Sequence, residues 1–315
     1  MTGDAAPTAV RAGRAGRSGE AEQAVQVTEF TDPACPWAWG SEPALRLLRH
    51  TLGQRAAWRR VFGILFEEDD DPPPDADAET RWYEGFVADV AAHTGAPFAL
   101  PLRRVTRTSL PASQAARAAE VQGPDVAERV LRRLREAMFV LGAPVDEPDG
   151  VREVVRGVPG LDVDALLSEA AAPRTRDSVE RDWSETRQPP REILELDAPG
   201  PHSGKAKLHN DRYRYALPTV LFEGAGGRVC VPGWRSFGEY LDAARTAAAA
   251  PLPGPSTVGA DEALGRWRSL TLPEFTALTG RAEPPAGAVR VETAGGPLWL
   301  HPDEARVHPV TALSA

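Results

Sequence analysis

The chain carries Phe30-Thr31-Asp32-Pro33-Ala34-Cys35-Pro36-Trp37-Ala38-Trp39-Gly40, the stretch that is most informative about its fold. Before it lies Val25 to Phe30, whose alternating and β-branched side chains predict a strand. Asp32-Pro33 is a pair typical of a turn. Pro36 suits the first turn of a helix, where its missing N–H would have no partner in any case. The stretch therefore predicts a strand, a turn and a helix that begins at Cys35.

The segments on either side extend this pattern. A helix continues to about Gly53 with a kink at Pro43, because proline removes a helical hydrogen bond. Strands are predicted at 57–65, 213–223 and 228–231, the last two forming a hairpin, and a helix at 236–250. Between the second and third strands, from about 76 to 200, the chain is mainly helical. The clearest of these helices spans 125–141 and ends at Gly142.

Composition sets the domain limits. Residues 1–24 hold almost no large apolar side chains, so we expect a disordered tail there. Residues 25–250 form the main domain, and 251–255 are a proline-rich linker. Residues 256–315 predict a small helix-helix-hairpin appendage. We expect this appendage to pack on the main domain or to mediate a homodimer.

Charge and cysteine content exclude several classes of function. The formal net charge is -9, whereas a nucleic-acid-binding protein needs a basic face. No stretch approaches the ~20 apolar residues of a membrane span. The start of the chain lacks the apolar run of a secretory signal, and there are two cysteines, so we expect a cytoplasmic protein with no disulfide scaffold. No cluster of Cys and His has the spacing of metal ligands.

A second string completes the pattern: Tyr215-Ala-Leu-Pro-Thr-Val-Leu-Phe222. The two strings, in the order strand-helix-strand, helical insert, strand-strand-helix, resemble the DsbA-like thioredoxin fold, and most closely its cytoplasmic FrnE-like oxidoreductase branch. Mycothiol-dependent reductases and kappa-class transferases are relatives of that branch. The resemblance implies an α/β, thioredoxin-like fold with a helical insertion, followed here by the small C-terminal α+β appendage.

The same resemblance implies the site residues. Cys35 matches the family's nucleophile and Pro218 its cis-proline, which lies beside that cysteine in relatives. Redox members carry a second cysteine where this chain has Ala38. Substrate-binding positions follow from their place next to these residues: Pro36, Trp37, Trp39, Leu217 and Thr219. A basic stretch leads into Pro218, and it is expected to bind the carboxylates of a thiol co-substrate and to stabilise the Cys35 thiolate. Its members are His202, Lys205, Lys207, His209, Arg212 and Arg214.

The chemistry depends on the state of one thiol. A cysteine attacks as a thiolate, and placement at a helix N-terminus can lower its pKa. In a Cys-x-x-Cys enzyme the second thiol releases the mixed disulfide, and Ala38 cannot do this. Cys230 lies between two valines in a predicted edge strand, so we expect it to have a structural rather than a catalytic role. Turnover would then need an external low-molecular-weight thiol, mycothiol or glutathione, and no bound cofactor.

Several interpretations stay open at this point. The leading one is a thiol-dependent oxidoreductase that acts on a small thiol or a protein disulfide through Cys35. A non-catalytic thioredoxin-fold binding module is the alternative, and a kappa-like thiol transferase or isomerase is a third. Cys35 is then either a monothiol nucleophile or a relic. Trp37 and Trp39 suit a substrate surface and a protein core equally well.

Overall fold

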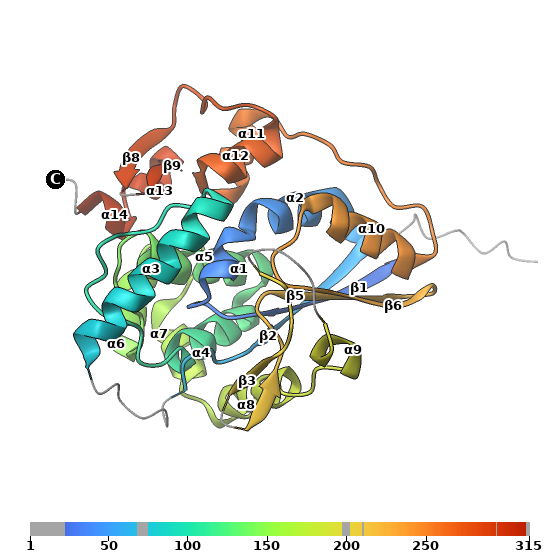
Figure 1. Cartoon of the computed structure of the whole chain (residues 1–315). Helices are drawn as coiled ribbons and strands as arrows, with labels where there is room; N and C mark the ends of the chain where they lie inside the picture. Colours follow the sequence, from blue (N-terminus) through green and yellow to red (C-terminus); the bar gives the residue numbers. More distant parts are fainter. Residues whose placement is uncertain (1–22, 68–74, 197–201, 210, 294, 313–315) are drawn as a thin grey trace, which may run out of the picture.

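A four-stranded sheet forms the centre of the molecule in the computed structural model, which describes residues 23–67, 75–196, 202–209, 211–293 and 295–312. Its strand order is β2-β1-β5-β6 (Figure 1). The strands are β1 (Val25–Thr31), β2 (Ala56–Phe62), β5 (Thr219–Gly224) and β6 (Gly227–Pro232). β1 runs parallel to β2 and antiparallel to β5, and β5 is antiparallel to β6. The tail predicted at 1–24 falls mostly outside the described residues.

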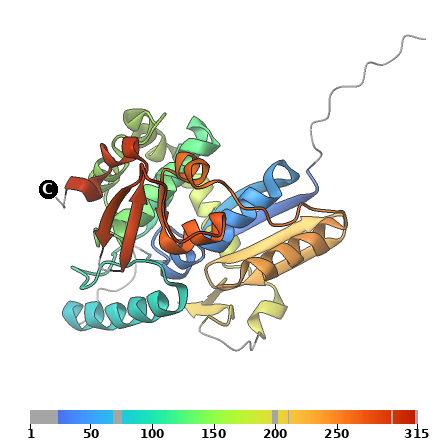
Figure 2. The same ribbon diagram turned by 90° about the horizontal axis from the view of Figure 1, so that it is seen from above.

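Two helices follow β1 where the sequence predicts one kinked helix. α1 (Pro36–Gly40) and α2 (Glu42–Leu52) meet at Ser41, so the chain breaks just before Pro43. η1 (Gly53–Arg55) leads on into β2. α2 and α10 (Phe237–Ala248) cover one face of the sheet, and their apolar side chains meet those of β1 and β5 (Figures 1 and 2). The thioredoxin-like sheet and its helices are therefore confirmed.

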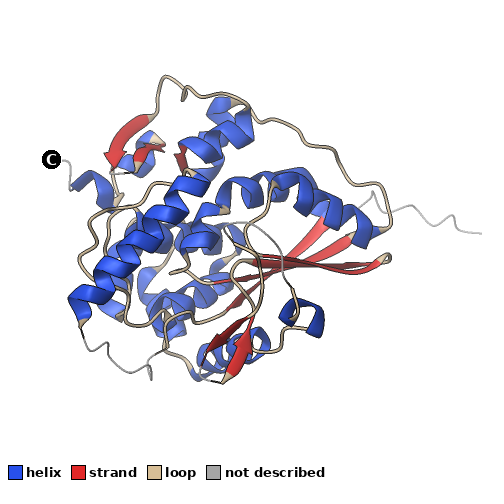
Figure 3. Cartoon of the chain, viewed as in Figure 1, coloured by secondary structure: helices blue, strands red, loops and turns tan. Residues whose placement is uncertain are grey.

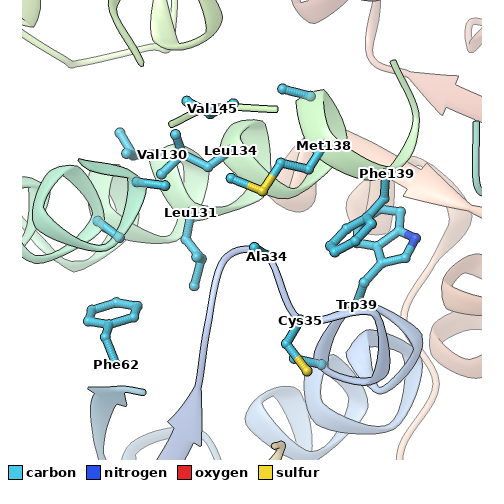
Figure 4. Packing of buried hydrophobic residues seen from close by; sticks show 14 of the residues in the cluster. Ala34, Cys35, Trp39, Phe62, Val130, Leu131, Leu134, Met138, Phe139 and Val145 are labelled. Carbon is cyan, nitrogen blue, oxygen red and sulfur yellow. The ribbon is translucent and has the colours of Figure 1, made fainter. Parts of the chain in front are cut away.

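Helices predominate in the described chain between β2 and β3 (Figure 3). Their bounds are α3 (Ala76–Thr94), α4 (Leu110–Ala119), η2 (Glu120–Gln122), α5 (Pro124–Phe139), α6 (Pro148–Val155), α7 (Val163–Ala170), α8 (Pro173–Thr186) and α9 (Arg191–Leu194). α5 is the helix predicted at 125–141, and Val130, Leu131 and Leu134 on it are buried beneath the loop that carries Cys35 (Figure 4).

The strand predicted at 213–223 is divided in the structure. β3 (Lys207–His209) and β4 (Arg212–Arg214) form a separate two-stranded sheet, and β5 begins only at Thr219. Pro218 has no N–H to donate to a strand ladder, so the segment before it leaves the sheet. The segment 215–218 is therefore free to face α1.

The C-terminal segment packs on the main domain. It contains α11 (Ala260–Trp267), β7 (Ser269–Thr271), α12 (Leu272–Thr279), β8 (Val289–Thr293), β9 (Gly296–Leu300), α13 (Pro302–Ala305) and α14 (Pro309–Ala312), with the strands in the order β7-β9-β8. α12 lies on α2, and three buried polar pairs join the segment to α5: Arg132–Glu274, Arg133–Glu304 and Glu136–His308. A homodimer through this segment stays a prediction.

Glu274 provides a test of this buried network. Its two carboxylate oxygens accept from Arg132 at 2.6 and 2.9 Å, and the residue also closes a capping box with Thr271. Glu274→Gln can still serve the cap but removes one of the two buried carboxylates that pair with Arg132, the other being Glu136. We expect the free energy of unfolding in urea to fall by about 1.5–3 kcal/mol, the contribution of a hydrogen bond to a charged group.

Glu239→Gln is the matched control, because Glu239 occupies the same place in the capping box of α10 but is exposed. Its free energy of unfolding should stay within about 0.5 kcal/mol of the native value. Equal losses in the two variants would contradict a stabilising role for the buried pair.

Candidate functional site

Cys35 is the N-cap residue of α1, as the sequence predicts. A tight turn places it there: the Cys35 N–H donates to the backbone oxygen of Asp32 at 3.2 Å, and the Ala34 N–H donates to Oδ1 of Asp32 at 2.7 Å. Asp32 Oδ2 accepts from the Leu65 N–H and the Ser109 hydroxyl, both at 2.8 Å. The buried aspartate thus fixes the loop that presents the thiol.

The segment before β5 closes the thiol from the other side. The Leu217–Pro218 peptide bond is cis, and the Leu217 carbonyl oxygen lies 3.4 Å from Cys35 Sγ and 3.1 Å from His202 Nε2. Because a carbonyl only accepts, both the thiol and this imidazole nitrogen donate to it. The Trp37 ring meets the His202 ring edge-on at 5.0 Å. Cys35 is consequently only 3% exposed.

The burial of Cys35 overturns the expected activation of its thiol. Loss of solvent raises the pKa of Cys35 to about 11, and the negative charge of Asp32 raises it further. A backbone hydrogen bond from Ala38 and the charges of Arg214 and Arg135 act in the opposite direction without compensating. The helix N-terminus is present, but desolvation of the anion is the larger effect. At neutral pH the thiol is protonated.

Burial also shifts the pKa values of two neighbouring groups, in each case in the direction that favours the neutral form. Burial raises the pKa of Asp32. Burial lowers the pKa of His202 to about 4, so its imidazole is neutral at pH 7. With the proton on Nε2, Nδ1 of His202 is buried without a hydrogen-bond partner among the described residues. Cys35 and His202 are therefore both neutral at pH 7 in the closed site.

Some of the predicted substrate-binding residues lie in the core. Trp39 is 1% exposed, donates from Nε1 to the Pro97 oxygen at 2.9 Å and stacks on Phe139 at 6.0 Å, so the substrate-surface prediction is wrong for it (Figure 4). The Thr219 hydroxyl is buried and donates to the Ala216 oxygen at 2.6 Å, so its proton is used within the protein. Pro36 and Leu217 line the closed site but are buried as well.

The basic stretch before Pro218 divides into exposed and buried residues. Lys205 and Lys207 are exposed, and neither is among the charges that act on Cys35. Their role in stabilising a thiolate stays a prediction. His209 lines a small cavity of about 190 Å³ together with Trp183, Arg187, Arg212 and Arg214.

Sequence reasoning included one residue that shapes the site in the expected basic stretch and missed two others. Arg214, from that stretch, is the cation whose charge reaches Cys35 and Asp32. Asp32 builds the turn, although the sequence marked it only as a turn residue. Tyr83 lines a small cavity beside Ala34, and the sequence placed it only in a helix of the insert. Their proximity to Cys35 arises from chain segments far apart in sequence.

An aromatic cluster lies next to the thiol loop. It consists of Phe66, Trp82, Tyr83 and Phe86. Trp82 is 69% exposed and stacks on Phe86 with ring centroids 6.1 Å apart, while Tyr83 meets Phe66 at 5.9 Å. Tyr83 connects the cluster to the site through the cavity beside Ala34. Exposed aromatic side chains of this kind are typical of protein interaction surfaces.

The described residues contain no group of His, Cys, Asp and Glu side chains that could hold a metal ion. Among the same residues, no helix is both long and apolar enough to cross a bilayer.

Comparisons with known proteins agree with the fold. A family model described as thioredoxin matches residues 29–188. A curated relative, the ClpXP adapter protein SpxH of Shouchella clausii, is 27% identical over 162 residues, which are 50% of this chain and 52% of that protein. The chain thus spans about half the length of that relative.

Solved structures of other proteins share the fold of this chain. A candidate protein disulfide isomerase from Nitrosomonas europaea superposes with a TM-score of 0.52 at 14% identity, covering 71% of this chain and 96% of that one. The cytosolic disulfide reductase DsbM from Pseudomonas aeruginosa, also solved with glutathione, gives a TM-score of 0.45 at 19% identity, covering 71% of this chain and 95–96% of that one.

The state of Cys35 can be measured by alkylation. With Cys230→Ala as background, we expect the rate of iodoacetamide modification of the folded chain to rise with pH toward an apparent pKa of about 11. The same chain unfolded in urea should titrate near ~8.5, the value of a free thiol. Half-maximal alkylation of the folded chain below ~8.5 would show that the thiolate is stabilised instead.

His202 should leave a signature in the dependence of stability on pH. Its pKa is about 4 in the folded chain against 6.5 for a free imidazole, so between these values the unfolded chain binds a proton that the folded chain does not. Stability is therefore lost as pH falls from 6.5 to 4. His202→Gln keeps an N–H donor but does not titrate. We expect the loss of unfolding free energy over this window to be smaller in the variant by about 1–3 kcal/mol. Parallel curves would contradict the assignment.

Proposed function

The chain belongs to the thioredoxin family, and on this premise we propose that it works by binding another protein rather than by thiol exchange. The closed Cys35 carries this proposal. A thiol that is protonated, 3% exposed and hydrogen-bonded to the Leu217 carbonyl is not a nucleophile in this conformation. The chain keeps the architecture of the DsbA type, while the thiol serves to join α1 to the segment before β5.

The absence of a resolving thiol supports the same conclusion. Ala38 replaces the residue that would release a mixed disulfide, and it is buried in α1. Cys230 is on β6, an edge strand, paired with Leu221 of β5, and burial raises its pKa to about 11 as well. Both cysteines are therefore thiols of low reactivity.

The aromatic cluster supplies the surface that such a function needs. Trp82, with its exposed ring stacked on Phe86, presents a large flat apolar area beside the thiol loop. Burying an aromatic side chain of this size at an interface contributes strongly to binding. We infer that the cluster holds an apolar segment of a partner protein. The matching relative is named as an adapter protein, which is a binding role.

A second candidate is a monothiol oxidoreductase with glutathione or mycothiol as co-substrate. The placement of Cys35 at a helix N-terminus, opposite the carbonyl before Pro218, favours it. Cys35 would first lose its proton and attack a disulfide, releasing one thiolate and forming a mixed disulfide. An external thiolate would then attack that bond and regenerate Cys35. Arg187, Arg212 and Arg214 in the 190 Å³ cavity would bind its carboxylates. A kappa-like transfer reaction would need the same opened site.

One experiment separates the two candidates. Binding of carboxymethylated lactalbumin, a permanently unfolded polypeptide, is measured by titration with the full chain. We expect Trp82→Ala to weaken binding at least about tenfold, since it removes the exposed anchor of the cluster. Val121→Ala, a change at an equally exposed apolar residue away from the cluster, and Cys35→Ala should leave binding unchanged.

The same preparations are incubated with glutathione disulfide at pH 7 in the Cys230→Ala background and weighed by mass spectrometry. No mixed disulfide should form at Cys35. A mixed disulfide together with unchanged polypeptide binding by Trp82→Ala would overturn the binding proposal and establish the monothiol candidate.

A further inference from the structure

A large cavity lies away from the thiol site, between β2, α2, the start of α5 and α11. Its volume is about 570 Å³, within the range of small-ligand pockets. It shares no lining residue with the thiol site or the aromatic cluster. Eight of its lining residues are arginines and three are acidic. In a chain with a net charge of -9, this concentration of guanidinium groups requires an explanation.

Most of these arginines are held in place by carboxylates. Arg49 and Arg60 both pair with Glu128, and Glu29 lies buried behind them. The two arginines hold the pKa of Glu128 well below its ordinary value. Arg59 pairs with Glu185 at 2.6 Å. These pairs fix the orientation of the guanidinium groups, so a ligand that uses their remaining N–H donors meets little further cost in entropy.

Two of the lining arginines have no carboxylate partner in the described part of the chain. Arg129 on α5 donates to the Pro159 oxygen at 3.2 Å, which leaves its charge uncompensated. Arg266 on α11 lies 3.4 Å from Nδ1 of His50, and burial together with the Arg266 charge lowers the pKa of that imidazole. Asp125, exposed at the start of α5, is the lining carboxylate without such a pairing. The unpaired charge in the cavity is thus positive.

Flat aromatic surfaces accompany these charges. Trp58 of β2 and Trp267 of α11 both line the cavity, and each carries a guanidinium 4.8 Å from its ring centroid, Arg49 and Arg266 respectively. A guanidinium stacked on an indole keeps its edge donors available for an oxyanion. The walls therefore combine planar surfaces with fixed donors for a phosphate or carboxylate.

From this combination we propose that the cavity is a binding site for a small organic anion of nucleotide size, with a planar ring and a phosphate group. The ring packs beside Trp58 and Trp267, over the guanidinium groups that stack on them. The phosphate is bound by Arg129 and Arg266 together with the remaining N–H groups of the paired arginines. Charge-assisted hydrogen bonds from guanidinium to phosphate are among the strongest polar contacts in proteins. The site acts independently of the proposed partner binding.

The test uses the full chain at low ionic strength and isothermal titration with three probes: ADP, pyrophosphate and adenosine. We expect saturable binding of ADP, with pyrophosphate and adenosine each at least about tenfold weaker, because each lacks one of the two groups. Arg129→Gln and Arg266→Gln should each weaken ADP binding at least about fivefold. Neither residue has a carboxylate partner among the described residues, so both variants should fold.

Arg245→Gln is the matched control, since Arg245 is an exposed arginine of α10 outside the cavity. Its ADP affinity should equal that of the native chain. The proposal is overturned if none of the anionic probes binds saturably, or if the control variant loses as much affinity as Arg129→Gln. Equal affinities for ADP and adenosine would also overturn it, because the anion would then contribute nothing.

Discussion

The buried guanidinium groups of α5 are the interaction on which the rest of the structure depends. Arg135 reaches Thr31 of β1 at 2.6 Å and pairs with Glu42 of α2, while Arg132 and Arg133 pair with the C-terminal segment. One helix thus connects the sheet, the first helices and the appendage. A buried charge is costly to leave unpaired, so each element must lie where its carboxylate meets the arginine. The network also fixes the base of the thiol loop and one wall of the large cavity.

At the thiol site, burial reverses the effect that the helix N-terminus would have on the pKa of Cys35. A helix N-terminus favours a thiolate, yet complete desolvation by α1, Leu217 and His202 disfavours it more strongly. The charges of Arg214 and Arg135 lower the pKa of Cys35, but by less than burial raises it. The same side chains that close the site hold α1 against the segment before β5. The thiol therefore acts as part of the packing.

The family indicates the fold, whereas the function has to be argued from the particular site. The architecture is thioredoxin-like, and the family match covers residues 29–188. A fold, however, carries many functions, and the particular site has to decide among them. Here the exposed features are the aromatic cluster on α3 and the arginine-lined cavity between α2, α5 and α11. Both are suited to binding, and neither requires Cys35 to react.

The sequence by itself determined the elements whose signals are local. The alternation of Val25 to Phe30, the Asp32-Pro33 turn, the proline after Cys35 and the apolar spacing along α5 each report nearby backbone, and the fold follows from their order. Only the tertiary structure decided what Cys35 can do, that Trp39 belongs to the core, and that Arg214 rather than Lys205 or Lys207 reaches the thiol. The burial and the charge around Cys35 depend on residues far apart in the chain, namely Asp32, Ser109, His202 and Leu217. No local sequence pattern predicts that these residues lie together.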